Sequence, residues 1–134
     1  MNPDVQAKFE SYPKGARLQL ESVRQLILST AAEGELGDVE EVLKWGEASY
    51  LVKGGTTIRI DWKPKDPDVI KVFFHCQTCL IETFKEIYRN EFEYEGTRAI
   101  VLPLSVNIEQ VPLRHCIELA LKYHRLKRLP LLGV

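Results

Sequence analysis

The residues with the clearest chemical potential are a histidine and two cysteines in the segment His75-Cys-Gln-Thr-Cys79. Two thiols separated by two residues can bind zinc or act as a redox pair. A structural zinc site needs two more ligands, and His115 and Cys116 offer them elsewhere in the sequence. The alternative is that the spacing is incidental and that Cys116, in an apolar helical stripe, is an ordinary buried thiol. We favour this alternative, because Cys76 and Cys79 flank a predicted strand-to-helix turn. A redox role is further disfavoured because the pair has no βαβ context of the thioredoxin kind.

A second set of candidates falls on one face of two predicted strands. Its members are Arg59, Asp61, Lys71 and His75. In this set Asp61 could orient His75 and Arg59 could hold an anion, which would make a small binding site. The alternative is a ladder of cross-strand ion pairs on a solvated sheet face. There is no nucleophile elbow and no phosphate-binding glycine loop, so the only catalytic hypothesis is His75 as an acid or base, and whether the protein is an enzyme stays open.

The third candidate region is the segment Val39–Leu51, which carries the rings of Trp45 and Tyr50 beside several acids. Asp38 and Glu41 have the spacing of a capping box and predict a short helix that ends at Gly46 and is followed by a strand. Either ring could anchor a ligand or a partner, because such rings combine contact area with a polar tip. The alternative is a core position, which we favour for Trp45 and weigh equally with ligand binding for Tyr50.

Helical periodicity and breaker residues define the elements that must position these candidates. The predicted helices are residues 3–12, 15–32, 79–89 and a last helix that starts at Pro112 and ends before Pro130. The stripe of the second helix consists of Ala16, Leu20, Val23, Ile27 and Ala31. Strands are predicted at residues 49–53, 56–63, 69–76, 92–95 and 98–102. We expect Gly54-Gly55 to form a two-residue hairpin turn between the first two strands.

This order of elements predicts a single α+β domain over residues 1–134, with an antiparallel sheet of about five strands and helices packed on one face. The alternation of the second strand puts Ile58, Ile60 and Trp62 on the face that takes the helices. The opposite face is predicted to be open and to show Arg59, Asp61, Lys63, Lys71, Phe73 and His75.

Bulk composition excludes several classes of protein. The net charge of −1 in 134 residues gives no global field for nucleic acid or an anionic membrane. The basic run Lys122–Arg128 has a simpler role at a helix C-terminus, so we expect no nucleic-acid partner. No apolar stretch is long enough to span a membrane, and the N-terminus does not have the pattern of a signal peptide. With three cysteines, an odd number, we expect reduced thiols and a cytoplasmic location.

Five segments together resemble the YdhG-like domain family, over most of the chain. They are EEVLKWGEASYL (40–51), GTTIRIDWK (55–63), VFFHCQTCLIETF (72–84), EGTRAIVLPL (95–104) and LRHCIELALKYH (113–124). The resemblance implies an α+β fold similar in outline to frataxin. Some relatives are described as intracellular iron chaperones, which implies an alternative function in iron or other metal handling. The alternative metal ligands would be Glu40, Glu41, Cys76 and Cys79.

The leading functional hypothesis is therefore a cytoplasmic module that binds a small molecule or a protein partner. Its site is predicted in the groove between the Trp45–Tyr50 segment and the open sheet face. The predicted site residues are Trp45, Tyr50, Arg59, Asp61 and His75. The cofactor and the oligomeric state stay open, although the apolar tail Leu131–Val134 or an exposed third strand could support a dimer.

Overall fold

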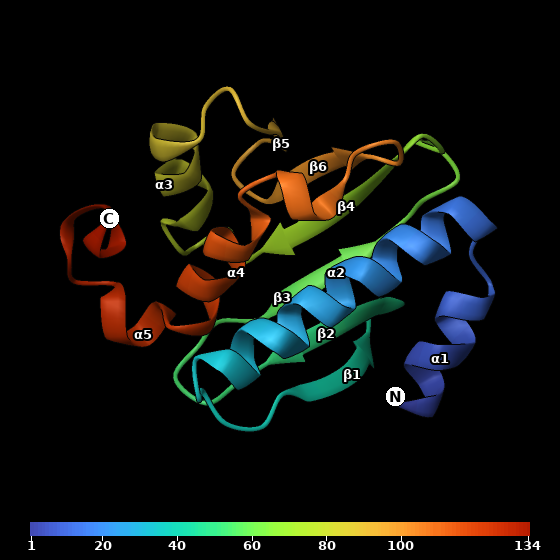
Figure 1. Ribbon diagram of the computed structural model, residues 1–134, viewed down its shortest axis with the longest axis horizontal. Helices are drawn as coiled ribbons and strands as arrows, with labels where there is room; N and C mark the ends of the chain where they lie inside the picture. The colour runs from blue at the N-terminus through green and yellow to red at the C-terminus, as the bar shows by residue number, and fades with distance from the viewer.

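The frame of the molecule is a six-stranded antiparallel sheet, seen in a computed structural model that describes residues 1–134 (Figure 1). The strands are β1 (Glu40–Lys44), β2 (Glu47–Leu51), β3 (Ile58–Asp61), β4 (Val69–Phe74), β5 (Glu93–Glu95) and β6 (Ala99–Pro103). Their order across the sheet is β1-β2-β3-β4-β6-β5, so β1 and β5 form the edges. The predicted α+β class with an antiparallel sheet is confirmed.

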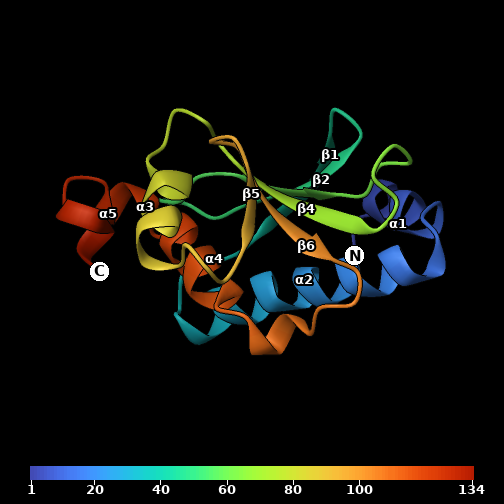
Figure 2. The same cartoon turned by 90° about the horizontal axis from the view of Figure 1, so that it is seen from above.

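The helices cover one face of this sheet. They are α1 (Pro3–Glu10), α2 (Lys14–Glu33), α3 (Leu80–Ile87), α4 (Leu113–Leu121) and α5 (Tyr123–Leu126), with 3₁₀ turns at Ile108–Gln110 and Pro130–Gly133. Figure 2 shows α2 and α4 below the sheet, whereas the end of the β1–β2 hairpin and the loop between β4 and α3 project from its upper side. The predicted stripe of α2 is buried at every position against the sheet and α4. Ile58 and Ile60 of β3 are buried on the same side, as their alternation predicts.

The predicted helix at the start of Val39–Leu51 is wrong, because this segment is a β-hairpin. Lys44 pairs with Glu47, and Trp45 and Gly46 form the two-residue turn between β1 and β2. Both turn residues have positive φ, 53° and 78°, as a type I′ hairpin turn requires. Asp38 and Glu41 have the spacing of a capping box but do not cap a helix. The carboxylate of Glu41 instead accepts hydrogen bonds from Arg24 of α2 and from the amide of Asn2.

Gly54-Gly55 is not the predicted two-residue turn. The connection between β2 and β3 is six residues long, and of the two glycines only Gly54 has a positive φ, 88°. Gly55 serves a different purpose, because an added Cβ there would lie 2.6 Å from the carbonyl oxygen of Leu121. The glycine therefore permits a close backbone approach between this loop and the end of α4.

The same approach divides the predicted last helix into α4 and α5. The amide of Thr56 donates to the carbonyl of Ala120 at 3.0 Å, and the amide of His124 donates to the carbonyl of Gly54 at 3.0 Å. Lys122, between the two, leaves helical geometry with φ −104° and ψ 10°. Hydrogen bonds between a loop and the backbone of a helix cannot be predicted from the periodicity of the helix alone.

Trp62 packs against the core, as its predicted place on the apolar face requires, but it lies just after the end of β3 and is only partly buried. Its ring packs edge-on against Tyr12, with centroids 6.3 Å apart. Its indole nitrogen donates to the carbonyl of Pro67 at 3.0 Å. Trp62 thus lies at the margin of the apolar layer, beside the connection between α1 and α2.

Candidate functional site

A hollow of about 370 Å³ opens on the sheet face that carries no helix, and we call it the open-face hollow. Its lining consists of Trp45, Glu47, Thr57, Arg59, Phe73, Phe74, His75, Cys76 and Arg98. In Figure 2 the β1–β2 turn and the loop between β4 and α3 both project from the upper side of the sheet, away from α2. These two projections supply opposite walls, and the strands between them supply the floor.

The floor is set by the antiparallel register of the central strands. Arg59 lies between Ser49 on β2 and Phe73 on β4, so all three side chains point to the open face. The Arg59 side chain is 35% exposed, and its Nε is 3.9 Å from a carboxylate oxygen of Glu47. Glu47 is closer to Lys63, at 3.3 Å. Arg59 therefore has only a long, shared ion pair.

One wall is Trp45, at the tip of the β1–β2 hairpin. Trp45 is 92% exposed, so the prediction that it packs in the core is wrong. Its φ of 53° lies in the left-handed region, where type I′ turns favour asparagine and glycine rather than a bulky side chain. The hairpin thus holds a large ring in water, in a backbone conformation that disfavours it.

The opposite wall is the turn that follows β4, and it contains His75 and Cys76. Nδ1 of His75 accepts a hydrogen bond from the amide of Gln77 at 3.1 Å, so a neutral ring carries its proton on Nε2. The carbonyl of His75 accepts from the hydroxyl of Thr78 at 2.6 Å, which closes the turn. The exposed ring of His75 is thus oriented by its own loop.

Arg98 is a hollow-lining residue that the sequence reading missed. It lies just before β6, where its carbonyl accepts from the amide of Phe74 at 2.8 Å. This bond brings Arg98 beside the end of β4, although Arg98 and Phe74 are 24 positions apart in the sequence. The guanidinium is exposed and takes part in no ion pair. No local motif reports this pairing, because β6 reaches β4 only after α3 and β5.

Of the five predicted site residues, the structure brings Trp45, Arg59 and His75 to the hollow and places two elsewhere. Asp61 is only 4% exposed, because it accepts hydrogen bonds from the hydroxyl of Tyr12 and, at 2.8 Å, from Lys63. Asp61 makes no hydrogen bond or ion pair with His75, so the predicted orienting role is not observed. Burial and the bond to Asp61 raise the pKa of Tyr12 well above its ordinary value.

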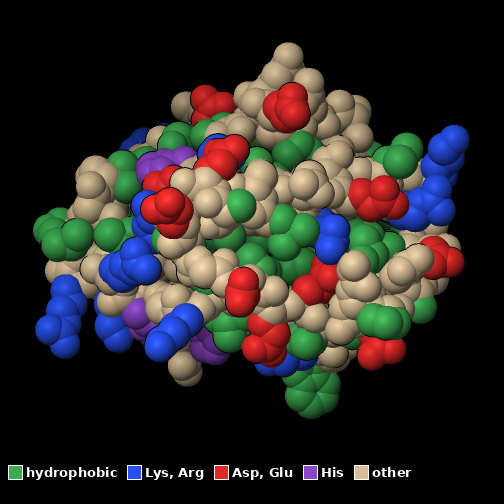
Figure 3. All heavy atoms as spheres, turned by 60° about the horizontal axis from the view of Figure 1, so that its bottom comes forward, with side chains coloured by type: hydrophobic (Ala, Val, Ile, Leu, Met, Phe, Trp, Pro, Cys, Tyr) green, Lys and Arg blue, Asp and Glu red, His purple; other side chains and the backbone are tan.

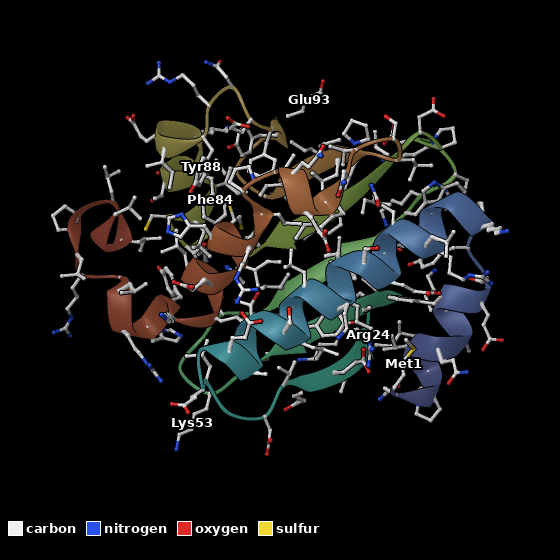
Figure 4. The ribbon with its side chains drawn as sticks, in the orientation of Figure 1. Met1, Arg24, Lys53, Phe84, Tyr88 and Glu93 are labelled. Carbon is white, nitrogen blue, oxygen red and sulfur yellow. The ribbon has the colours of Figure 1, made fainter.

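Tyr50 lies on the helix-facing side and is fully buried. Its hydroxyl donates to the Glu41 carboxylate at 2.8 Å, and Arg24 donates to the same carboxylate through Nε at 2.5 Å and Nη2 at 3.3 Å. The amide of Asn2 adds a bond at 2.9 Å. We call these four residues the Glu41 cluster. Figure 4 shows the Arg24 side chain reaching from α2 towards β1.

The Glu41 cluster has a clear electrostatic signature. Burial alone would raise the pKa of Glu41, but bonds from Arg24, Asn2 and Tyr50 outweigh it and hold the pKa below its ordinary value. The pKa of Tyr50 is raised, first by burial and then by its bond to Glu41. The carboxylate is therefore ionised and fully partnered, and it ties the N-terminus, α2, β1 and β2 together.

The alternative metal ligands are not gathered into one site. No group of three or more His, Cys, Asp or Glu residues is placed to hold a metal ion. Glu41 is occupied by its cluster, Glu40 is an exposed residue of the edge strand, and all three cysteines are free thiols. Burial raises the pKa of Cys116, and Nδ1 of neighbouring His115 is 2.6 Å from the hydroxyl of Tyr88. Tyr88 directly follows the last residue of α3 (Figure 4).

The basic segment forms a separate surface. Figure 3 shows Lys and Arg side chains gathered at the left end, where α5 lies, and acidic groups spread over the rest of that face. Lys122 pairs with Glu118 at 3.4 Å, whereas Arg125, Lys127 and Arg128 take part in no ion pair. Because α5 has only four residues, its dipole explains less of this charge than the predicted long helix would.

None of the helices combines the length and the apolar composition needed to cross a membrane. Comparison with known proteins returns no matching family model, no matching curated protein and no matching solved structure.

Proposed function

We propose that this protein is a binding module and that its site is the open-face hollow, which takes a small molecule or a group from a protein partner. The observation that carries the proposal is Trp45, whose ring is 92% exposed at a hairpin tip with φ 53°. Left-handed geometry costs an L-residue roughly 1–2 kcal/mol, and the exposed ring gains nothing by burial. Such local conflicts are expected at functional positions, where a contact made on binding offsets them.

Binding is a better proposal than catalysis for these residues. A histidine that acts as a general base needs an unprotonated nitrogen that is free to reach the substrate. Nδ1 of His75 accepts from a backbone amide, so Nε2 of the neutral ring carries the proton, and Asp61, which could accept that proton, is occupied by Tyr12 and Lys63. The same reasoning disfavours iron handling through Glu41, because Arg24 and Tyr50 already occupy that carboxylate. We therefore assign His75 to the wall of a binding site.

We further propose that the chain is a cytoplasmic member of the YdhG-like family. The support for the family is the set of five motif segments, together with an α+β architecture of the kind that the resemblance implies. The support for the location is three free thiols, of which Cys76 is exposed. Exposed reduced thiols are typical of reducing compartments.

The test uses the two tryptophans as a reporter and its internal control. In a ¹⁵N spectrum each indole N–H gives a separate signal, and Trp45→Phe and Trp62→Phe variants assign them. We expect small charged or aromatic probes to shift the Trp45 signal and to leave that of Trp62, which is bonded to Pro67, in place. If no probe moves the Trp45 signal, or if both signals move equally, the hollow is not the site.

A further inference from the structure

We infer that the ligand of the open-face hollow is a small flat ring that carries one oxyanion group, either a carboxylate or a phosphate. This inference rests on the proposed function and specifies its ligand class. Two observations carry it independently: the balance of charge around the hollow, and the arrangement of flat side chains on its floor and wall.

The charge around the hollow is incompletely balanced. Arg98 lines it and takes part in no ion pair, and Arg59 has only the contact at 3.9 Å with Glu47. Glu47 is the one acidic residue in the lining, and it is already 3.3 Å from Lys63. Asp61, the acid on β3, shares the same Lys63 at 2.8 Å and also accepts from the hydroxyl of Tyr12. The lining thus has an excess of guanidinium charge for which the protein supplies no counter-ion.

Guanidinium groups select the chemistry of the missing counter-ion. Their planar fork of N–H donors matches the two oxygens of a carboxylate or phosphate. Arg59 belongs to β3 and Arg98 to the segment just before β6, so the two arginines enter the lining from different parts of the sheet. A single compact oxyanion would satisfy this arrangement. A nucleic-acid backbone is a poorer fit, because its phosphates need an extended basic surface rather than two arginines beside a glutamate.

The flat surfaces select the rest of the ligand. Phe73 and Arg59 are cross-strand neighbours on the floor, where β3 and β4 pair, and Trp45 forms a wall. Aromatic rings stack on such rings and on guanidinium planes. The volume of about 370 Å³ is at the low end for small-molecule sites, which limits the ligand to one or two rings.

The experiment separates ring from charge by titrating the untagged protein with four probes in the ¹⁵N assay. 1-Naphthoate and 1-naphthyl phosphate carry both features on the same ring system, 1-naphthylmethanol carries the ring alone, and inorganic phosphate carries the charge alone. We expect at least one of the first two to bind about tenfold more tightly than either single-feature probe, the gain of one charge-assisted pair. Which of them binds more tightly distinguishes a carboxylate ligand from a phosphate ligand.

Three variants test the assigned roles. Arg98→Gln is expected to weaken the charged-ring probe about tenfold and to leave 1-naphthylmethanol unchanged. Trp45→Ala is expected to weaken all three ring-bearing probes, and because this variant removes the indole reporter, its affinities are measured by isothermal titration calorimetry alongside those of the wild type. Arg128→Gln is the control, because it removes an exposed arginine at the C-terminal end and should change neither affinity.

The outcomes separate the two proposals. If 1-naphthylmethanol or phosphate binds as tightly as the charged-ring probes, the ligand class is wrong while the hollow remains a binding site. The same holds if Arg98→Gln and Arg128→Gln weaken binding equally. If no probe shifts the Trp45 signal, the proposed function fails together with the inference.

Discussion

The Glu41 cluster and the open-face hollow contain the same kinds of side chain on opposite faces of one sheet. Each has an arginine, a glutamate and an aromatic ring. In the cluster, the Glu41 carboxylate accepts bonds from Arg24, Tyr50 and the amide of Asn2 at 2.5–3.3 Å. In the hollow, Arg59 is 3.9 Å from Glu47 and Arg98 has no ionic partner.

The difference shows that the same types of side chain can have either a structural role or a binding role. Charges removed from water must be partnered, and a partnered set of this kind holds elements in place. Charges at the rim of a hollow can stay free, because water solvates them until a ligand arrives. Whether the charged side chains have partners within the protein therefore distinguishes the Glu41 cluster from the candidate site better than residue type does.

The largest effect on stability is expected where the partnered set is broken. Glu41→Gln leaves the guanidinium of Arg24, whose side chain is 18% exposed, without a counter-charge. We expect the free energy of unfolding to fall by about 2 kcal/mol in a urea titration. Glu40→Gln, on the exposed neighbouring residue, is the control and should change it by less than about 0.5 kcal/mol. Equal losses in the two variants would show that Glu41 does not hold the elements together.

A smaller effect follows from acidification. The folded pKa of Glu41 lies below its ordinary value of 4.5, so its contribution to stability is fully present above about pH 4.5 and is lost as the pH falls through the folded pKa. We expect the unfolding midpoint of the wild type to drop more steeply below pH 4.5 than that of Glu41→Gln. Parallel curves for the two proteins would contradict this assignment.

In the hollow the expected effect on stability has the opposite sign. Trp45→Asn places a residue that tolerates positive φ at the hairpin tip, so we expect the free energy of unfolding to rise by about 1 kcal/mol. The same variant should lose the binding of ring-bearing probes. Thermal unfolding combined with a titration checks both results, and a destabilised variant would show that Trp45 supports the hairpin rather than a ligand.

The smallest effect on stability is expected at Arg98. Arg98→Gln removes an exposed charge that takes part in no ion pair, so the free energy of unfolding should change by less than about 0.5 kcal/mol. Binding of the charged-ring probe should nevertheless fall. A loss of stability comparable to that of Glu41→Gln would remove the distinction between the two regions.

Local patterns were enough to predict the layered architecture. The stripe of α2 and the alternation of Ile58 and Ile60 depend only on the repeat of each element, so they could be recognised within a few turns or a few residues. The hairpin at Trp45 and Gly46 was missed because the preceding residues also fit a capped helix. Pairing with β2 decided between the two structures, and it leaves no unique trace in a short window.

The candidate site divides in the same way. The residue types and the alternation of β3 by themselves put Arg59 on the open face, and the end of β4 put His75 close to it. Tertiary structure alone decided that Tyr50 and Asp61 are partnered in the interior and that Arg98 reaches the hollow. The reason is physical. The direction of a side chain follows from local geometry, but its partners and its exposure depend on segments that pack together only in the folded chain.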